Sequence, residues 1–505
     1  MAEGRAADPI KLTADLVARG VALAQAGRWP EALEHFQHSL AIAPASAAVW
    51  SNAAFALRTL GRTGEAAEAI ARAVAIDASI ADAWNIYGLV EQDRRDFAAA
   101  RSHFRHALTL NPRFPQAWMN LGNSEQALGN AAAAIEAYEK ALAMDPRLPE
   151  IHYNLGLLQS NAMGEIERAI AHYRQAIELA PDFALAHHNL AHCLFLLGRF
   201  DQAWREHQWR SPRRGYAGTP RLAQQPAELA CEDLAGERFL VLAEQGLGDI
   251  LFYLRYAPAL RARGAMLDFA GDPRLHPMLA RTGLFERFAA NAAEAGGQTT
   301  ELLAGDLPLA VTPPGHSIEV APPLALTADR DRIAAARRRL QALGKGPYVA
   351  IAWRAGEPKT GLNETLYKTV PLDLLGAALR HLDATFISVQ RDPGPDETPA
   401  LSSALGHPVH DLSSVNRDLE DTLAWMEAVD LYVGVSSTNV HLRASLGRDA
   451  HVLVPFPPEW RWMAQGASPW FPAMRVYRQQ ASREWQPALD RLAADLRRDL
   501  DTRSR

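Results

Sequence analysis

Three tryptophans at one spacing constrain this chain more than any other feature of its sequence. Trp50, Trp84 and Trp118 lie 34 residues apart, and related positions continue to about residue 210. A fixed period of this length indicates a stack of similar units, because each unit alone is too small to bury its apolar face. The first part of the chain is therefore predicted to be an all-helical array.

Other positions recur with the tryptophans. Small residues, an aromatic residue and a proline follow at fixed offsets, as in Gly88, Ala100, Phe104, Ala107 and Pro112, and again in Gly122, Ala134, Tyr138, Ala141 and Pro146. This pattern resembles the tetratricopeptide repeat. It predicts about six helix pairs over residues 1–210, in which the glycines let paired helices approach and the aromatic rings fill the remaining space. Such arrays have a concave groove that binds extended peptides or partner helices.

Asparagine recurs at one place in four repeats, while the third repeat carries Ile86 there. Side-chain amides both donate and accept hydrogen bonds, so a row of them is able to hold a peptide backbone without reading its sequence. The row resembles the asparagine ladder in the repeats of the eukaryotic O-linked N-acetylglucosamine transferase. That resemblance implies acceptor binding; the alternative is that these residues simply face water. The row consists of Asn52, Asn120, Asn154 and Asn189.

Composition excludes several other classes. With 22% charged residues and a net charge of −6, the chain lacks the basic surface expected of a nucleic-acid-binding protein. Two cysteines indicate no disulfide framework, and the sequence has no signal-peptide core and no apolar run of membrane-spanning length. We expect a cytoplasmic protein without a membrane span.

Helical periodicity stops in residues 211–226, which are rich in Pro, Gly and Arg. Strand-like and helix-like segments then alternate, a pattern typical of α/β domains. The predicted fold class is α + α/β, with a repeat superhelix over residues 1–210, a linker over 211–236, and two Rossmann-like halves over 237–330 and 331–505. Strands are expected at 239–243, 266–270, 307–311, 348–353, 385–390, 431–435 and 451–454, and helices at 330–343, 372–381 and 419–428.

One stretch of the last half combines a buried strand with a polar turn. Leu431–Val435 is apolar, and hydroxyl and amide side chains follow it where a helix should begin. A strand end that leads into a helix N-terminus is suited to an anion such as a nucleotide diphosphate; an ordinary capped turn is the alternative. The residues concerned are Ser436, Ser437, Thr438, Asn439 and His441.

Longer motifs resemble a bacterial group in which such repeats are fused to a glycosyltransferase. They are EQGLGDILFYLRYAPALRARGA, VPLDLL, DLEDTLAWMEAVDLYVGVSSTNVHLRASLG and PFPPEWRWM. The C-terminal part is similar to the heptosyltransferases of lipopolysaccharide synthesis and, more distantly, to the O-linked N-acetylglucosamine transferase. The resemblance implies the GT-B plan of twin Rossmann-like domains, and some proteins of this architecture are flagellin glycosyltransferases.

The G-x-G-D turn of the family matches Gly246, Gly248 and Asp249. By resemblance, Asp249 is the general base that deprotonates the acceptor hydroxyl; its alternative role is a helix N-cap. Glu244 is the reserve candidate for the base.

The donor side is implied by the same resemblance. Lys368 matches a lysine that neutralises the leaving diphosphate, which together with the lack of a D-x-D motif implies metal independence. Trp353 and Arg354 end a strand at the same edge, where Arg354 would grip phosphate, and Gln390 at the next strand end would contact base or ribose. A solvated lysine and a surface arginine are the alternatives.

In one place the sequence departs from the family. Relatives usually carry Asp-Thr where this chain has Ser436-Ser437, which indicates either a different sugar, for instance one with its own carboxylate, or reduced or lost catalysis. Trp460, Arg461 and Trp462 are interpreted as packing residues that cap the cleft.

The leading interpretation is an inverting, metal-independent glycosyltransferase that needs no cofactor beyond its nucleotide-sugar co-substrate. Its acceptor would be a Ser or Thr hydroxyl of a protein held by the repeats, with flagellin as the preferred acceptor. One rival is a non-catalytic repeat adaptor with a degenerate transferase-like domain. Another is a transferase acting on a glycan or lipid. Fold alone does not decide among them.

Overall fold

The computed structural model describes residues 9–211, 213, 222, 225–296, 299–356 and 368–503. The chain divides into two compact units: an N-terminal unit of Met1–Leu158 with Gln175–Pro181, and a C-terminal unit of Gln159–Arg174 with Asp182–Arg505. Residues 212, 214–221, 223 and 224 of the predicted linker and residues 357–367 lie outside the described residues.

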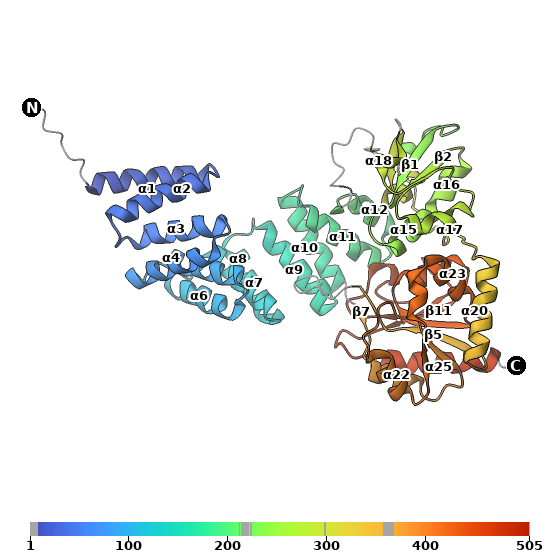
Figure 1. The fold of residues 1–505 in the computed structure, drawn as a ribbon. Coiled ribbons are helices and arrows are strands. Elements are labelled where there is room, and N and C mark those ends of the chain that lie inside the picture. Colours follow the sequence, from blue (N-terminus) through green and yellow to red (C-terminus); the bar gives the residue numbers. More distant parts are fainter. Residues whose placement is uncertain are drawn as a thin grey trace, which may run out of the picture. The chain divides into compact units, whose positions relative to one another are not determined.

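The repeat region is entirely helical, as its period predicts. Twelve α-helices follow one another in the described part of the first 207 residues, two for each predicted repeat (Figure 1). They are α1 (Pro9–Gln25), α2 (Trp29–Ile42), α3 (Ala47–Thr59), α4 (Thr63–Ile76), α5 (Ala81–Asp93), α6 (Phe97–Leu110), α7 (Pro115–Ala127), α8 (Ala131–Met144), α9 (Pro149–Leu158), α10 (Ile166–Leu179), α11 (Ala184–Leu196) and α12 (Phe200–His207).

Glycine and aromatic residues interlock within the helix pairs, which confirms the predicted close approach. A Cβ placed on Gly88 would lie 2.4 Å from a ring carbon of Phe104, and one on Gly122 would lie 2.4 Å from a ring carbon of Tyr138. Phe104 and Tyr138 are fully buried. The glycine is thus required because the ring already occupies the space where a side chain would begin.

The periodic tryptophans brace the connections between repeats. Each indole Nε1 donates a hydrogen bond to a carbonyl six residues earlier: Trp50 to Pro44 at 2.8 Å, Trp84 to Ala78 at 2.8 Å and Trp118 to Pro112 at 3.0 Å. The bond ties the start of one repeat to the turn that precedes it, so the 34-residue spacing reflects a repeated hydrogen bond as well as repeated packing.

The C-terminal unit contains two parallel sheets, which places this part of the chain in the α/β class (Figure 1). The first sheet has the order β3-β2-β1-β4, formed by β1 (Arg238–Leu242), β2 (Met266–Ala270), β3 (Phe288–Ala289) and β4 (Thr300–Leu303). The second has the order β12-β11-β10-β5-β8-β9, formed by β5 (Tyr348–Ala352), β8 (Thr385–Ser388), β9 (Val409–Asp411), β10 (Leu431–Val435), β11 (Ala450–Val454) and β12 (Met474–Arg478). A small antiparallel pair joins β6 (Arg354–Ala355) to β7 (Lys368–Thr369).

Helices connect these strands, as parallel pairing requires. In the first half they are α14 (Pro226–Leu229), α15 (Leu247–Tyr253), α16 (Ala257–Ala262), α17 (His276–Ala280), α18 (Ala292–Ala295) and α19 (Leu307–Ala310). In the second half they are α20 (Arg330–Leu343), α21 (Leu372–Leu379), α22 (Glu397–Leu405), α23 (Leu419–Ala428), α24 (Thr438–Ser445) and α25 (Gln486–Arg503).

One predicted strand is wrong. Residues 307–311 were expected to form a strand, but Leu307–Ala310 form α19; β4, which begins seven residues earlier, pairs with β1 on the side opposite β2. Pro308 lies in the first turn of α19. A proline cannot donate to a sheet ladder, whereas its missing N–H is harmless at the start of a helix.

The last helix pair, α11 with α12, belongs to the C-terminal unit, although the predicted boundary follows it at residue 211. Phe195 of α11 stacks on Trp460 with ring centroids 4.2 Å apart, and Ala464 N–H donates to the Leu196 carbonyl at 3.0 Å. The Asp201 carboxylate of α12 accepts from Ile318 N–H at 2.7 Å. The pair therefore packs as a part of the α/β unit.

Candidate functional site

The turn after β1 presents Asp249 at the carboxyl end of the first sheet. Gln245 adopts a left-handed φ of 65°, and Gly246 N–H donates to Asp249 Oδ2 at 3.1 Å. A Cβ on Gly248 would lie 2.8 Å from His441 Cδ2, so this glycine allows the turn to pack directly on the second half. The carboxylate of Asp249 keeps 30% of its surface exposed.

Glu244, the reserve candidate for the base, lies in a different environment. Its side chain is 3% exposed and forms a two-bond ion pair with Arg210, Nε to Oε2 at 2.9 Å and Nη2 to Oε1 at 2.6 Å. It also accepts from Gly305 N–H at 2.6 Å. Arg210 further contacts Asp306 Oδ1 at 2.9 Å. Glu244 therefore holds the last repeat against the first sheet.

The turn after β10 has the predicted form. Ser437 is the N-cap residue of α24, although its side chain makes no capping hydrogen bond, and its hydroxyl lies 3.4 Å from that of Tyr432. Ser436 and Asn439 are buried, while Thr438 is half-buried. Burial lowers the pKa of His441 well below its usual range, and the charge of Arg461 acts in the same direction, so the imidazole is neutral.

Four charged side chains of alternating sign, Asp249, Arg461, Glu459 and Lys368, form a connected row between the two halves, here called the charge chain. Asp249 Oδ1 lies 2.5 Å from Arg461 Nη2, and Arg461 Nη1 lies 2.6 Å from Glu459 Oε1. Glu459 Oε2 lies 2.5 Å from Lys368 Nζ. Ser436 joins the chain, since its hydroxyl donates to Glu459 Oε2 at 2.9 Å and its carbonyl accepts from Lys368 at 3.2 Å.

The two central residues of the charge chain, Glu459 and Arg461, are held in their ionised forms by their neighbours' charges. Burial would raise the pKa of Glu459, but Lys368 and Arg461 outweigh it and place the pKa well below its usual range. Burial would lower the pKa of Arg461, yet Asp249 and Glu459 raise it. The guanidinium lies over Phe252 and Trp460, with its carbon 4.6 and 4.4 Å from the ring centroids. Both aromatic rings therefore hold the guanidinium by cation–π contacts.

Three of the predicted donor contacts lie outside the charge chain. Arg354 pairs with Glu397, Nε to Oε1 at 3.0 Å. The Gln390 amide is 1% exposed; its oxygen accepts from the N–H groups of Trp353 and Arg354 at 3.0 Å, and its nitrogen donates to two backbone carbonyls. Trp353 is buried in the core of the second half. Gln390 therefore ties the ends of β5 and β8 together.

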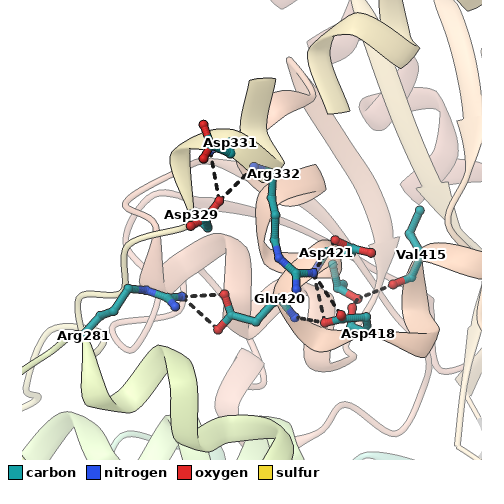
Figure 2. A network of polar contacts seen from close by, with 9 residues as sticks. Arg281, Asp329, Asp331, Arg332, Val415, Asp418, Glu420 and Asp421 are labelled. Atoms are coloured by element: carbon teal, nitrogen blue, oxygen red, sulfur yellow. Dashed lines mark hydrogen bonds and ion pairs between the residues drawn. The ribbon is translucent and has the colours of Figure 1, made fainter. Parts of the chain in front are cut away.

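A second ion-pair network connects the halves (Figure 2). Arg281, which follows α17, contacts Glu420 of α23 through Nη2 at 2.9 and 2.8 Å, and its Nε donates to the Thr327 carbonyl. Arg332 of α20 lies 2.9 Å from Asp418 and 2.5 Å from Asp421, beside the same helix start (Figure 2). The two halves are thus bridged by charge here as well as at Asp249.

The asparagine row is divided between the two units. Asn120 is buried, and its amide donates to Asn85 at 3.0 Å, while the amide of Asn154 donates to Asn123 at 2.9 Å. Asn52 is half-buried on α3 in the same unit, and Asn189 lies on α11 in the C-terminal unit. Two members of the row therefore link neighbouring repeats directly.

Sequence reasoning missed Glu459 and assigned Arg461 to packing alone. Both follow β11, so they lie at the carboxyl end of a strand next to β10. In open parallel sheets ligands bind at that edge, which was the available signal. The pair was missed because aromatic residues dominate the surrounding PFPPEWRWM run, so the pattern indicates packed core.

Every helix in the described part of the chain is too short or too polar to span a lipid bilayer. The described ranges contain no group of three or more His, Cys, Asp or Glu side chains arranged to hold a metal ion.

Comparison with known proteins confirms the repeats. Family models for the TPR repeat match residues 122–162 and 160–198, and one for the tetratricopeptide repeat matches residues 23–88. Protein FlbA of Caulobacter vibrioides is 25% identical over 361 residues, which cover 66% of this chain and 59% of FlbA. The chain thus spans less than two thirds of that relative's length.

Solved structures similar to part of this chain include proteins of Pseudomonas aeruginosa and Thermus thermophilus. PilF of Pseudomonas aeruginosa is 21% identical with a TM-score of 0.38, covering 42% of this chain and 94% of its own. A TPR protein of Thermus thermophilus is 24% identical with a TM-score of 0.32, covering 36% and 98% respectively.

Proposed function

We propose that this chain is a glycosyltransferase that moves a sugar from a nucleotide-activated donor to a Ser or Thr hydroxyl of a protein. The observation that carries the proposal is the charge chain from Asp249 to Lys368. It brings a carboxylate from the turn after β1 together with two cations of the second half, Lys368 of β7 and Arg461, which follows β11. A base on one side and phosphate-binding cations on the other are the groups that glycosyl transfer requires.

Each group has a defined role in this proposal. Asp249 takes the proton of the acceptor hydroxyl while the oxygen attacks the anomeric carbon from the face opposite the phosphate. The bond from that carbon to the phosphate oxygen breaks, and the phosphate leaves with the electron pair. Lys368 and Arg461 neutralise the charge that develops on it, and the product has inverted configuration. A positioned base contributes about 10²–10⁴ in rate.

The repeats support a protein as the acceptor. Arrays of this kind bind extended peptides or partner helices, and their presence here is supported by the family models. The row of Asn52, Asn120, Asn154 and Asn189 is proposed to contact the acceptor, and the amides of Asn120 and Asn154 also donate to neighbouring asparagines. Flagellin is the first acceptor to test, since the resembling architecture includes flagellin glycosyltransferases.

Nucleotide binding is the first test. The full chain is heated in the presence of UDP, GDP, ADP, CMP and their sugar conjugates. A nucleotide at one hundred times its Kd should stabilise the binding state by about 2.7 kcal/mol. One clear hit supports the transferase and names the donor class, whereas silence across the panel with folded protein favours the rival adaptor function.

A substitution at the base separates catalysis from binding. Asp249→Asn should abolish transfer and still allow the donor to bind, while Asp331→Asn, on the exposed start of α20, should leave both unchanged. Transfer is measured by mass spectrometry of the acceptor, with protein and lipid or glycan acceptors compared in parallel. Full activity of Asp249→Asn would remove this residue from the mechanism.

A further inference from the structure

Glu459 occupies the centre of the charge chain and contacts both of its cations. One carboxylate oxygen lies 2.6 Å from Arg461 and the other lies 2.5 Å from Lys368. The second oxygen also accepts the hydroxyl of Ser436 at 2.9 Å. One acidic side chain thus satisfies two cations and a hydroxyl at the same time, as a phosphate group would do.

Arg461 retains an unused donor at this point. Its side chain is 6% exposed, and its Nε is buried with no hydrogen-bond partner among the described residues. A buried unsatisfied N–H of a guanidinium is rare in folded proteins and indicates a missing acceptor. Phe252 and Trp460 pack against the guanidinium, with its carbon 4.6 and 4.4 Å from the ring centroids, so aromatic contacts restrain the side chain that carries this donor.

We propose that Glu459 is an internal substitute for the donor's phosphate, and that an incoming phosphate takes Arg461 and Lys368 from it. This inference rests on the proposed function, because it describes how that donor enters its site. Phosphate oxygens and the carboxylate compete for the same two cations, since both sets of contacts use the same donors. The unliganded protein therefore holds its phosphate-binding cations in a blocked but correctly oriented state.

The exchange also affects the base. Arg461 Nη2 donates to Asp249 Oδ1 at 2.5 Å, so this carboxylate oxygen is occupied and does not reach an acceptor hydroxyl. When phosphate draws Arg461 away, Asp249 becomes available to the acceptor hydroxyl. Donor binding then precedes and enables deprotonation, so the enzyme does not activate a hydroxyl or water before the donor is present.

The test uses inorganic pyrophosphate as the probe and the full-length chain, with binding measured by titration calorimetry. Glu459→Gln keeps the shape and removes the competing charge. It should bind pyrophosphate at least about tenfold more tightly, because a unit charge in contact with a cation changes an equilibrium by more than tenfold at a partly buried site. Unchanged or weaker binding would overturn the proposal, since it would show that Glu459 only holds the cations in place.

Glu427→Gln is the matched control. Glu427 lies in the same half, is also 19% exposed and is paired with an arginine, Arg448, at 2.5 Å. Its replacement removes the same charge and should leave pyrophosphate binding unchanged. A tenfold gain in this control would assign the effect to net charge and overturn the exchange.

A second variant covers the case in which Glu459→Gln does not fold. Asp249→Asn removes the other carboxylate from Arg461 and, at 30% exposure, should be tolerated; it should also tighten pyrophosphate binding, by about threefold or more. The two proposals fail differently. If the wild-type chain binds a nucleotide but neither variant gains affinity for pyrophosphate, only the exchange is refuted. If no variant binds any phosphate compound, both are refuted.

Discussion

The ion cluster at Arg210 makes the sharpest stability prediction. Arg210 is fully buried and holds two carboxylates that are themselves almost fully buried, Glu244 and Asp306. Burial would lower the pKa of Arg210, but the two carboxylates raise it. Replacing it by methionine would leave Glu244 without its cation and Asp306 with Arg213 as its remaining partner.

The expected magnitude follows from this geometry. Removing one partner of a buried ion pair destabilises a protein by about 3–5 kcal/mol, because the remaining charge is left uncompensated. Arg210→Met should therefore lower the free energy of unfolding of the C-terminal unit by that amount. Adding Glu244→Gln removes the stranded charge, so the double variant should recover more than half of the loss.

Hydrogen exchange in urea, read by mass spectrometry on peptides covering β1 and α15, reports this unit separately from the repeats. Arg337→Met on the exposed face of α20 is the control and should stay within about 0.5 kcal/mol of wild type. A loss below about 1 kcal/mol for Arg210→Met, or no recovery in the double variant, would refute the uncompensated-charge argument.

Three further predictions concern the repeats, the boundary and pH. Gly122→Ala should destabilise the N-terminal unit by about 1–3 kcal/mol in urea unfolding because its Cβ meets the Tyr138 ring; Gly64→Ala, which meets nothing within 4 Å, should instead be neutral or stabilising by up to about 1 kcal/mol. A fragment of residues 182–505 should be soluble and a fragment of 211–505 should aggregate, because the latter lacks Arg210 and exposes Trp460; equal solubility of the two would contradict the assignment of α11 and α12. Burial lowers the pKa of His207 and His441 well below the unfolded value, so the unfolded chain binds protons at a higher pH than the folded chain does. The free energy of unfolding should therefore fall as the pH drops below about 6.5, by up to about 1.4 kcal/mol per pH unit for each histidine. A flat profile of unfolding free energy between pH 7.5 and 5.5 would refute this prediction.

Much of the fold was accessible from the sequence because its signals are local. The bounds of β2, α20, α23 and β10 match the predicted segments, since alternation, helical period and cap residues all lie within each element. The strand prediction for residues 307–311 was wrong because an apolar run of that length fits either a short strand or a helix, and Pro308 favours the start of a helix. Strand β12 was missed because its Met-Arg-Val-Tyr-Arg sequence gives a weak apolar signal.

The site was only partly predictable for a different reason. Asp249, Lys368 and Ser436 stand in recognisable turns, and the structure brings all three into one network. Glu459 and Arg461 acquire their importance from partners 23 to 212 residues away. A side chain's role in such a network depends on long-range packing, which no local pattern contains. The same holds for Gln390, whose amide is occupied by backbone that only the folded sheet brings near.

The interlock of small and large residues in the repeats has a consequence for how the sequence is able to change. Gly20 meets Phe36 and Gly88 meets Phe104 at a spacing of 16 residues; in the second repeat the same two places hold Ala54 and Ile70, both fully buried in one core cluster. An added methyl on one helix thus coincides with a smaller side chain on the other. Enlarging the first place alone produces a clash, and shrinking the second alone leaves a cavity. Accepted substitutions at these places should therefore be epistatic, so that the repeats diverge by paired replacements which preserve the distance between helices.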